Sequence, residues 1–155
     1  MTQLALWLLV TALGIQTGAG LFETRVLVPL WSNSPPASVI AYSSSATRPD
    51  SGRRLWIVLT PLTGLISLVN LAAAWLNHGP GRTWWLASSG GALFVIAVTF
   101  AYFIPVLLRL PNAAQIPEAE LTKMVRWWVR LNWCRFAVLV AAWLAALKAF
   151  SYGAG

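Results

Sequence analysis

The sequence predicts an all-α fold, a four-helix transmembrane bundle, and three observations support this class. Charged residues make up only 10% of the 155 residues, whereas a soluble domain has about a quarter. Hydrophobic residues make up 58% and gather in four blocks, each close to or longer than the roughly 20 helical residues that cross a bilayer. The blocks are continuous rather than alternating, which argues against transmembrane strands. We therefore expect one integral membrane domain over residues 1–155.

The four predicted helices cover residues of about 4–30, 55–77, 83–110 and 119–150. The first block lacks a positively charged start and is too long for a signal peptide, so we expect an uncleaved helix. The turn over residues 77–81 is so short that helices two and three must be antiparallel neighbours. Residues 34–45 contain two prolines and three consecutive serines, and we expect an irregular loop that lies on the bundle.

The basic residues are unevenly distributed between the two predicted membrane faces. Four spans place the first and third loops on one face, and both termini with the middle turn on the other. Only Arg82 and Lys148 fall on the second face, and nine basic residues fall on the first: Arg25, Arg48, Arg53, Arg54, Arg109, Lys123, Arg126, Arg130 and Arg135. Because cytoplasmic loops are enriched in Lys and Arg, we expect a protein of the bacterial inner (cytoplasmic) membrane with both termini outside the cytoplasm. The basic residues would contact anionic membrane lipids and not nucleic acid.

The residue composition restricts the cofactor chemistry. With one His and one Cys, the chain alone cannot form a zinc finger, a bis-His haem site or a redox dithiol. We interpret His78, in the middle turn, as a solvated histidine unless another chain supplies a second ligand. We interpret Cys134 as a small, buried apolar residue. We therefore expect no metal and no cofactor.

Two ionisable residues fall inside predicted helices, where charge is costly and function is the default explanation. Glu23 lies in the first helix and Arg135 in the fourth. Asn132 is expected on the flank of the face that includes Arg135. That face should pack against the other helices, and its members follow three- and four-residue spacing: Leu121, Met124, Trp128, Leu131, Arg135, Val138, Ala142 and Ala145. On the opposite side, lipid headgroups would be reached by Lys123, Arg126 and Arg130.

The same spacing places Gln16 on the face of the first helix that includes Glu23. Tyr102 of the third helix falls in a similar layer, and the phase of Trp128 directs its ring to the same place. We predict a polar pocket in the cytoplasmic half of the bundle, with Glu23 and Arg135 as its charge pair. Alternatively, the pair does no more than lock helices one and four together, because an unpaired buried partner would be costly.

Three stretches resemble a family of small four-helix membrane proteins named for anthrone oxygenases. They are Gly18-Ala19-Gly20-Leu21-Phe22-Glu23, followed six residues after Glu23 by Pro29; Phe103-Ile104-Pro105-Val106-Leu107; and Trp127-Trp128-Val129-Arg130-Leu131-Asn132-Trp133-Cys134-Arg135. The likeness spans most of the chain. Many relatives have Asn two positions before and two after the helix-three proline, where this chain has Phe103 and Leu107.

The resemblance implies an oxygenase that converts an anthrone-like phenolic or quinone-type substrate with dioxygen, without metal or flavin. Glu23 would be the base, and Arg135 and Asn132 would stabilise the enolate oxygen. Trp128 and Tyr102 would stack on aromatic rings, and Gln16 would complete the substrate pocket.

Two further hypotheses remain open. The residues at positions 103 and 107 and the ten tryptophans, most of them near span ends, favour a non-catalytic accessory subunit of a larger membrane complex, or a lipid- or quinone-binding protein. Such a protein would have a larger complex or a homo-oligomer as its partner. A Glu in the first helix also suggests a small proton-coupled exporter, although those chains are usually shorter.

Overall fold

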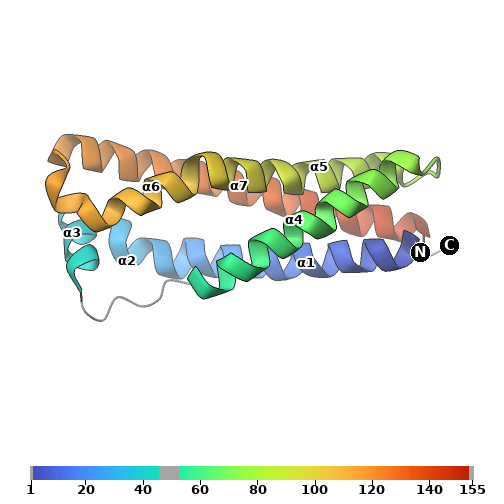
Figure 1. The fold of residues 1–155 in the computed structure, drawn as a ribbon, viewed down its shortest axis with the longest axis horizontal. Coiled ribbons are helices and arrows are strands. Elements are labelled where there is room, and N and C mark those ends of the chain that lie inside the picture. Colours follow the sequence, from blue (N-terminus) through green and yellow to red (C-terminus); the bar gives the residue numbers. More distant parts are fainter. Residues whose placement is uncertain (1, 46–52, 154–155) are drawn as a thin grey trace.

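The computed structural model describes residues 2–45 and 53–153, and almost all of them are helical. Four long rods lie side by side, with both chain termini at one end (Figure 1). We call this end, which includes the turn over residues 77–81, the terminal end. The opposite end, which includes α3 (Ala37–Ser44), is the loop end.

The four rods match the four predicted helices. The first comprises α1 (Thr2–Phe22), a π-helical turn η1 (Glu23–Leu27) and α2 (Val28–Ser32). The second is α4 (Arg53–Leu76). The third comprises α5 (Arg82–Val98), a π-helical turn η2 (Thr99–Phe103), α6 (Ile104–Arg109) and a 3-10 turn η3 (Leu110–Gln115), so it continues past the predicted end at residue 110. The fourth is α7 (Glu118–Gly153).

All four rods are long and apolar enough to cross a membrane. The qualifying segments are Gln3–Ser32, Arg54–Leu76, Arg82–Gln115 and Glu118–Tyr152. The shortest has 23 residues and is about 35 Å long, compared with the roughly 30 Å of a bilayer's hydrocarbon core. Large apolar side chains such as Leu65 and Leu68 are exposed on the outer surface, as lipid contact requires. The predicted all-α bundle is confirmed, and its helices are those of a membrane protein.

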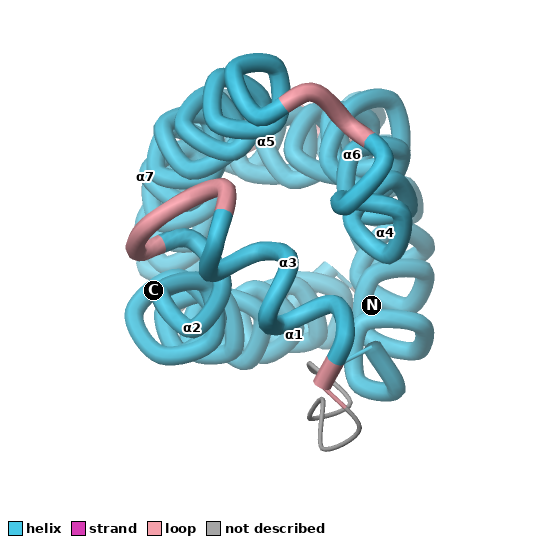
Figure 2. Tube along the Cα trace, turned by 90° about the vertical axis from the view of Figure 1, so that its left-hand side faces the viewer, coloured by secondary structure: helices cyan, strands magenta, loops and turns pink. Residues whose placement is uncertain are grey.

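Around the bundle axis the rods follow the order α1, α4, α5, α7, and each packs against two neighbours (Figure 2). Two glycines allow close contact with α7. A Cβ atom at Gly14 would lie 3.2 Å from the indole nitrogen of Trp143, and one at Gly91 would lie 3.3 Å from the Cβ of Ala142. Larger residues at these two positions would push α1 and α5 away from α7.

Residues 34–45 contain a helix, so the expectation of an irregular segment was wrong. The N–H of Ser38 bonds to the carbonyl of Ser34, and its hydroxyl donates to the carbonyl of Trp31 at 2.8 Å. The prolines precede α3, where a missing N–H removes no intrahelical bond. The expected position on the bundle is confirmed, because α3 packs on α2 and η3 and leaves only 1% of Val39 exposed.

The buried apolar residues form two separate clusters, one toward each end of the bundle. The terminal-end core includes Leu13 and Leu139, and the loop-end core includes Val28 and Trp128. Between Trp128 and Leu139, the buried residue of α7 is Asn132. On the first rod, between Leu13 and Val28, the buried side chains are polar: Gln16, Thr17 and Thr24. The interior is therefore polar in its middle section.

Candidate functional site

Two of the rods that form the site contain a π-helical turn, and each turn precedes a proline. η1 begins at Glu23, six residues before Pro29, and η2 begins at Thr99, six residues before Pro105. In both, the N–H just after the turn bonds to the carbonyl of the turn's first residue, five positions earlier. Proline has no N–H, and its ring clashes with the carbonyl four residues before it, so the helix widens ahead of it. Such π-helical turns are frequent at functional sites.

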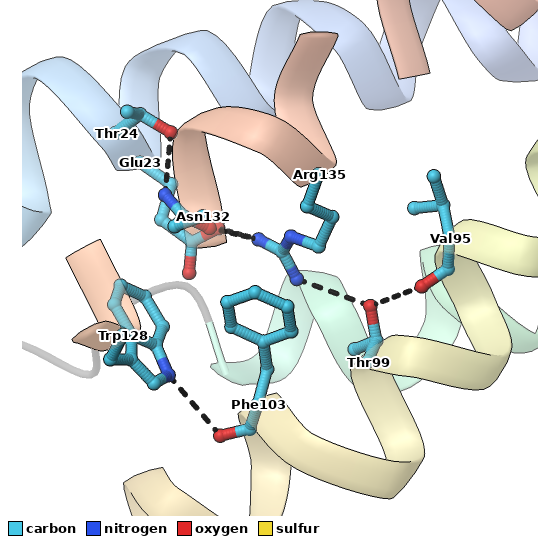
Figure 3. A network of polar contacts seen from close by, with 8 residues as sticks. All are labelled: Glu23, Thr24, Val95, Thr99, Phe103, Trp128, Asn132 and Arg135. Carbon is cyan, nitrogen blue, oxygen red and sulfur yellow. Dashed lines mark hydrogen bonds and ion pairs between the residues drawn. The ribbon is translucent and has the colours of Figure 1, made fainter. Parts of the chain in front are cut away.

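Arg135 on α7 is the centre of a hydrogen-bond network that joins α7 to both π-helical turns (Figure 3). Its guanidinium donates to Oε2 of Glu23 at 3.3 Å and to Oγ1 of Thr99 at 3.2 Å. It also donates to Oδ1 of Asn132, one turn earlier on α7, at 2.7 Å. Asn132 in turn donates to Oγ1 of Thr24 at 3.0 Å. These contacts, which we call the Arg135 network, connect three of the four rods at one level of the bundle.

Aromatic rings close one side of the Arg135 network. The guanidinium carbon of Arg135 lies 4.4 Å from the ring centroid of Phe103, in cation–π geometry. Trp128 meets the same ring edge-on at 5.3 Å and donates its indole N–H to the carbonyl of Phe103 at 3.4 Å. Trp31 packs against Trp128 at 5.1 Å. The guanidinium is thus held between polar acceptors and an apolar wall.

Of the six residues that the sequence predicts for the site, three meet in the Arg135 network: Glu23, Arg135 and Asn132. Asn132, expected on the flank of the packing face, lies at its centre with only 1% of its surface exposed. The face is rotated relative to the prediction, because Val125 and Leu139 are buried while Met124 and Val138 are only half-buried.

The other three predicted residues lie outside the hydrogen bonds of the network. Trp128 is 1% exposed and belongs to the aromatic wall. Tyr102 is half-buried and meets Phe103 edge-on at 5.3 Å. Gln16 is buried, but it lies two helical turns from Glu23, about 10 Å along the rod. Its Oε1 has no hydrogen-bond partner among the residues that the structure describes.

Sequence reasoning missed Thr24 and Thr99 and treated Phe103 only as a departure from relatives. Both π-helical turns begin six residues before a proline. This spacing is only a partial signal, because Pro61 lies inside the regular helix α4 without such a turn before it. The hydroxyl of Thr99 donates to the carbonyl of Val95 at 2.7 Å, which leaves its oxygen free to accept from Arg135. A threonine that bonds its own helix in this way is common in membrane helices, so it gives no warning in the sequence.

The two charged groups differ in how fully they are bonded. Arg135 has three acceptors and an aromatic ring around its guanidinium. Within the described part of the chain, the Glu23 carboxylate accepts one bond of 3.3 Å, although a carboxylate can accept about four. The side chains of Arg135 and Glu23 are 16% and 13% exposed, so the pair lies at the edge of the interior. The guanidinium is fixed, whereas the carboxylate keeps acceptor capacity.

The surface has a cavity near each end of the bundle, and neither of these two cavities includes a residue of the Arg135 network in its lining. The loop-end cavity has a volume of about 600 Å³. Three basic side chains of α7 line it, Lys123, Arg126 and Arg130, together with one acidic side chain, Glu118, and Pro36. The terminal-end cavity has a volume of about 310 Å³ and is lined by residues of the 77–81 turn and by Trp85.

His78 and Cys134 take no part in the Arg135 network. His78 is exposed in the turn at the terminal end. Cys134 is a free, exposed thiol next to Arg135 in the chain, so the expectation of a buried cysteine was wrong. Over residues 2–45 and 53–153, no group of three or more His, Cys, Asp and Glu side chains could hold a metal ion. Comparison of the chain with protein-family models, with curated proteins and with solved structures gives no match in any of the three.

Proposed function

We propose that this membrane protein binds a phenolic or quinone-type molecule at Glu23 and Arg135 and oxidises it as cofactor-independent anthrone oxygenases do. The observation that supports this most is the open acceptor capacity of the Glu23 carboxylate beside a fixed guanidinium. A phenol or an acidic C–H would give its proton to the carboxylate, and Arg135 would stabilise the resulting anion. Apolar aromatic molecules dissolve in the bilayer, so they would reach the exposed edge of the pair directly.

The proposed reaction needs only a base and a cation from the protein. Loss of a proton from the methylene carbon of an anthrone leaves an enolate that reduces dioxygen itself. The methylene carbon becomes a carbonyl, and the second oxygen atom leaves as water. Glu23 would take the proton, and Arg135 would hold the enolate oxygen. Asn132, bonded to the guanidinium at 2.7 Å, would position Arg135 for this task.

The test is oxygen uptake by the purified protein in lipid nanodiscs on addition of an anthrone. Glu23→Gln should lower the rate by at least about 100-fold, the usual contribution of a general base. Arg135→Lys should lower it as well, because Lys keeps the charge but cannot reach all three acceptors. The exposed residues Glu120 and Arg130 provide matched controls, as Glu120→Gln and Arg130→Lys, and these should turn over normally. Normal turnover by both Glu23→Gln and Arg135→Lys would disprove catalysis at this pair.

A second candidate function is that of an accessory subunit in a larger membrane complex, or of a lipid- or quinone-binding protein. It is supported by the bonds of Arg135 and Asn132 to the first and third rods, which join three rods without a ligand. Exposed tryptophans offer contact area for lipid or for a partner: Trp7, Trp75, Trp84, Trp127 and Trp133. A subunit would copurify in mild detergent with a fixed partner at constant stoichiometry and would show no oxygen uptake alone.

For the membrane orientation, we propose that the loop end faces the cytoplasm and that both termini lie on the non-cytoplasmic side of the inner membrane. The exposed basic residues of α7 support this, because the loop-end cavity they line suits the phosphate groups of anionic lipids. Only two basic residues of the sequence, Arg82 and Lys148, belong to the terminal end. A periplasmic reporter fused to the C-terminus should be active, and activity of a cytoplasmic reporter there would contradict the orientation.

A further inference from the structure

Seven buried polar groups in the middle of the bundle lack a hydrogen-bond partner among the described residues. They come from all four rods: Oε1 of Gln16 and the hydroxyl of Thr17 on α1, the hydroxyls of Thr63 and Ser67 on α4, those of Ser88 and Ser89 on α5, and the indole N–H of Trp143 on α7. We call these groups the open polar cluster. Five of the six residues other than Trp143 are at most 4% exposed, and Thr17 is 9% exposed.

One contact between α4 and α5 relates the levels of Ser67 and Ser88, two members of the open polar cluster. The indole N–H of Trp85 donates to Oδ1 of Asn70 at 2.9 Å, which fixes α4 against α5. Ser67 lies three residues from Asn70, and Ser88 lies three residues from Trp85. Because the two rods are antiparallel, both steps lead toward the loop end, by about 4.5 Å. Ser67 and Ser88 therefore lie at a similar level on these neighbouring rods.

The members on α1 and α7 lie in the same section of the bundle. Gly14 on α1 approaches Trp143, and Gly91 on α5 approaches Ala142, so these residues mark one level on three rods. Gln16 lies two residues from Gly14, and Ser88 lies three residues from Gly91. The cluster therefore spans about 10 Å of bundle length or less.

The hydroxyls of the cluster do not make the bonds that membrane helices ordinarily provide. Serine and threonine inside such helices usually donate to a carbonyl three or four residues earlier. Thr99 does so at 2.7 Å, and the amide of Asn70 does so at 2.8 Å. Ser67 and Ser88, which are 0% exposed, do not. Buried polar groups that stay without a hydrogen-bond partner in a lipid-surrounded bundle are costly, so a small polar molecule bonded to them would stabilise the bundle.

The cluster also lies between two other polar features. Toward the terminal end it meets the Asn70–Trp85 pair, and Trp85 lines the terminal-end cavity. Toward the loop end, α4 presents the buried hydroxyl of Thr60, one turn beyond Thr63. A Cβ at Gly64 would lie 3.4 Å from Ile96, which sets Thr60 near the level of Thr99 in the Arg135 network.

We propose that the open polar cluster binds ordered water and that these waters form a hydrated path from the terminal-end cavity to the Arg135 network. Each buried water typically makes two to four hydrogen bonds, which matches a cluster of hydroxyls, one amide oxygen and one indole N–H. The path would let Glu23 exchange protons with the water at the terminal end without any movement of the rods. The proposal goes beyond the proposed oxygenase and does not depend on it, because it concerns water and no organic ligand.

Water-edited solid-state NMR of the full chain in lipid bilayers tests this directly on the unmodified protein. Magnetisation from water should reach the side chains of Ser67 and Ser88 as fast as it reaches exposed Thr83. The equally buried Ala74 and Ala92 provide the matched control and should receive it slowly. If Ser67 and Ser88 are as slow as Ala74, the cluster is dry and the proposal is overturned.

A blocking substitution tests where the water enters. Ser67→Val should interrupt the path, so water transfer to Thr63, farther from the terminal end, should fall to the level of Ala74. The lipid-facing neighbour gives the control Leu68→Val, which should leave Thr63 unchanged. If Ser67→Val does not fold, Ser89→Val on the facing rod takes its place. Undiminished transfer to Thr63 in a folded blocking variant would overturn entry from the terminal end.

Discussion

The Arg135 network and the open polar cluster are two polar regions of one apolar bundle, and they differ in how their hydrogen bonds are completed. In the network, donors of α7 meet acceptors on two other rods at 3.0–3.3 Å. In the cluster, hydroxyls and an amide oxygen from neighbouring rods have no partner among the described residues. From this difference we infer that the Arg135 network holds the rods together, whereas the open polar cluster binds the proposed waters.

Backbone geometry accounts for part of this difference. The network residues of the first and third rods lie in the π-helical turns η1 and η2. A π-helical turn has more residues than an α-helical turn, so it changes the direction of the side chains within it. This allows the consecutive residues Glu23 and Thr24 both to bond to α7. The cluster residues lie in regular α-helices, and their side chains are distributed over the helix–helix interfaces.

The largest effect on stability is expected from Arg135→Met. The substitution leaves the Glu23 carboxylate without its cation and removes contacts to Asn132 and Thr99, so the free energy of unfolding should fall by about 3–5 kcal/mol. Unfolding by SDS titration in mixed micelles measures it. Arg130→Met removes an exposed cation from the same helix and should change stability by less than about 0.5 kcal/mol. Equal losses for the two variants would contradict a network that fastens three rods.

The next largest effect is expected from Asn132→Leu. Leucine has a similar volume but leaves Thr24 and Arg135 each short of one bond, so the loss should be about 1–3 kcal/mol. Asn132→Asp retains an acceptor for the guanidinium and should lose less. The same unfolding assay compares the two. Both variants lack the donor to Thr24, so an Asp variant no more stable than the Leu variant would contradict a stabilising bond from Arg135 to this side chain.

A smaller effect is expected from Thr99→Val, which removes one acceptor of Arg135 and leaves two. The loss should be about 0.5–1.5 kcal/mol, the net contribution of a typical hydrogen bond, because two other acceptors still bond to the guanidinium. The double variant of Thr99→Val and Asn132→Leu should lose more unfolding free energy than the sum of the two single losses. In it, Glu23 is the one remaining hydrogen-bond acceptor of the guanidinium among the described residues. Strict additivity would mean that Thr99 does not act through Arg135.

The smallest effect is expected from Ser67→Ala and Ser88→Ala. Neither hydroxyl has a described protein partner, so its removal leaves no protein group unpaired, and the unfolding free energy should change by less than about 0.5 kcal/mol. The unfolding assay used for Arg135→Met applies. A loss as large as that of Asn132→Leu would show that the serines are bonded directly to protein groups, and the contrast between the two regions would fail.

The fold could be predicted from the sequence because its signal is long and repeated. Four apolar blocks of membrane-spanning length leave few alternatives to a helical bundle. The helix α3 could not be predicted in this way. Its eight residues follow two prolines, and its stability comes from packing of Val39 against the bundle, which depends on tertiary structure.

The candidate site could be predicted from the sequence where it involves charged residues. Glu23 and Arg135 stand out because ionisable groups inside a membrane are rare. The predicted packing face of the fourth helix includes Leu131, but the buried residue there is the next one, Asn132. Over a helix of 36 residues, a fixed three- and four-residue spacing no longer follows one face. Thr24 and Thr99 were missed because the direction of their side chains depends on the π-helical turns. The open polar cluster was missed because serine and threonine are ordinary residues of membrane helices.

The most direct test of the central claim, that the first and fourth rods are joined through Glu23 and Arg135, is a double-mutant cycle with Glu23→Gln and Arg135→Met. Unfolding free energies of the wild type, both single variants and the double variant give the coupling between the two side chains. A direct contact within one network predicts a coupling of at least about 1 kcal/mol. Losses that add to within about 0.5 kcal/mol would contradict it, because independent sites behave in that way.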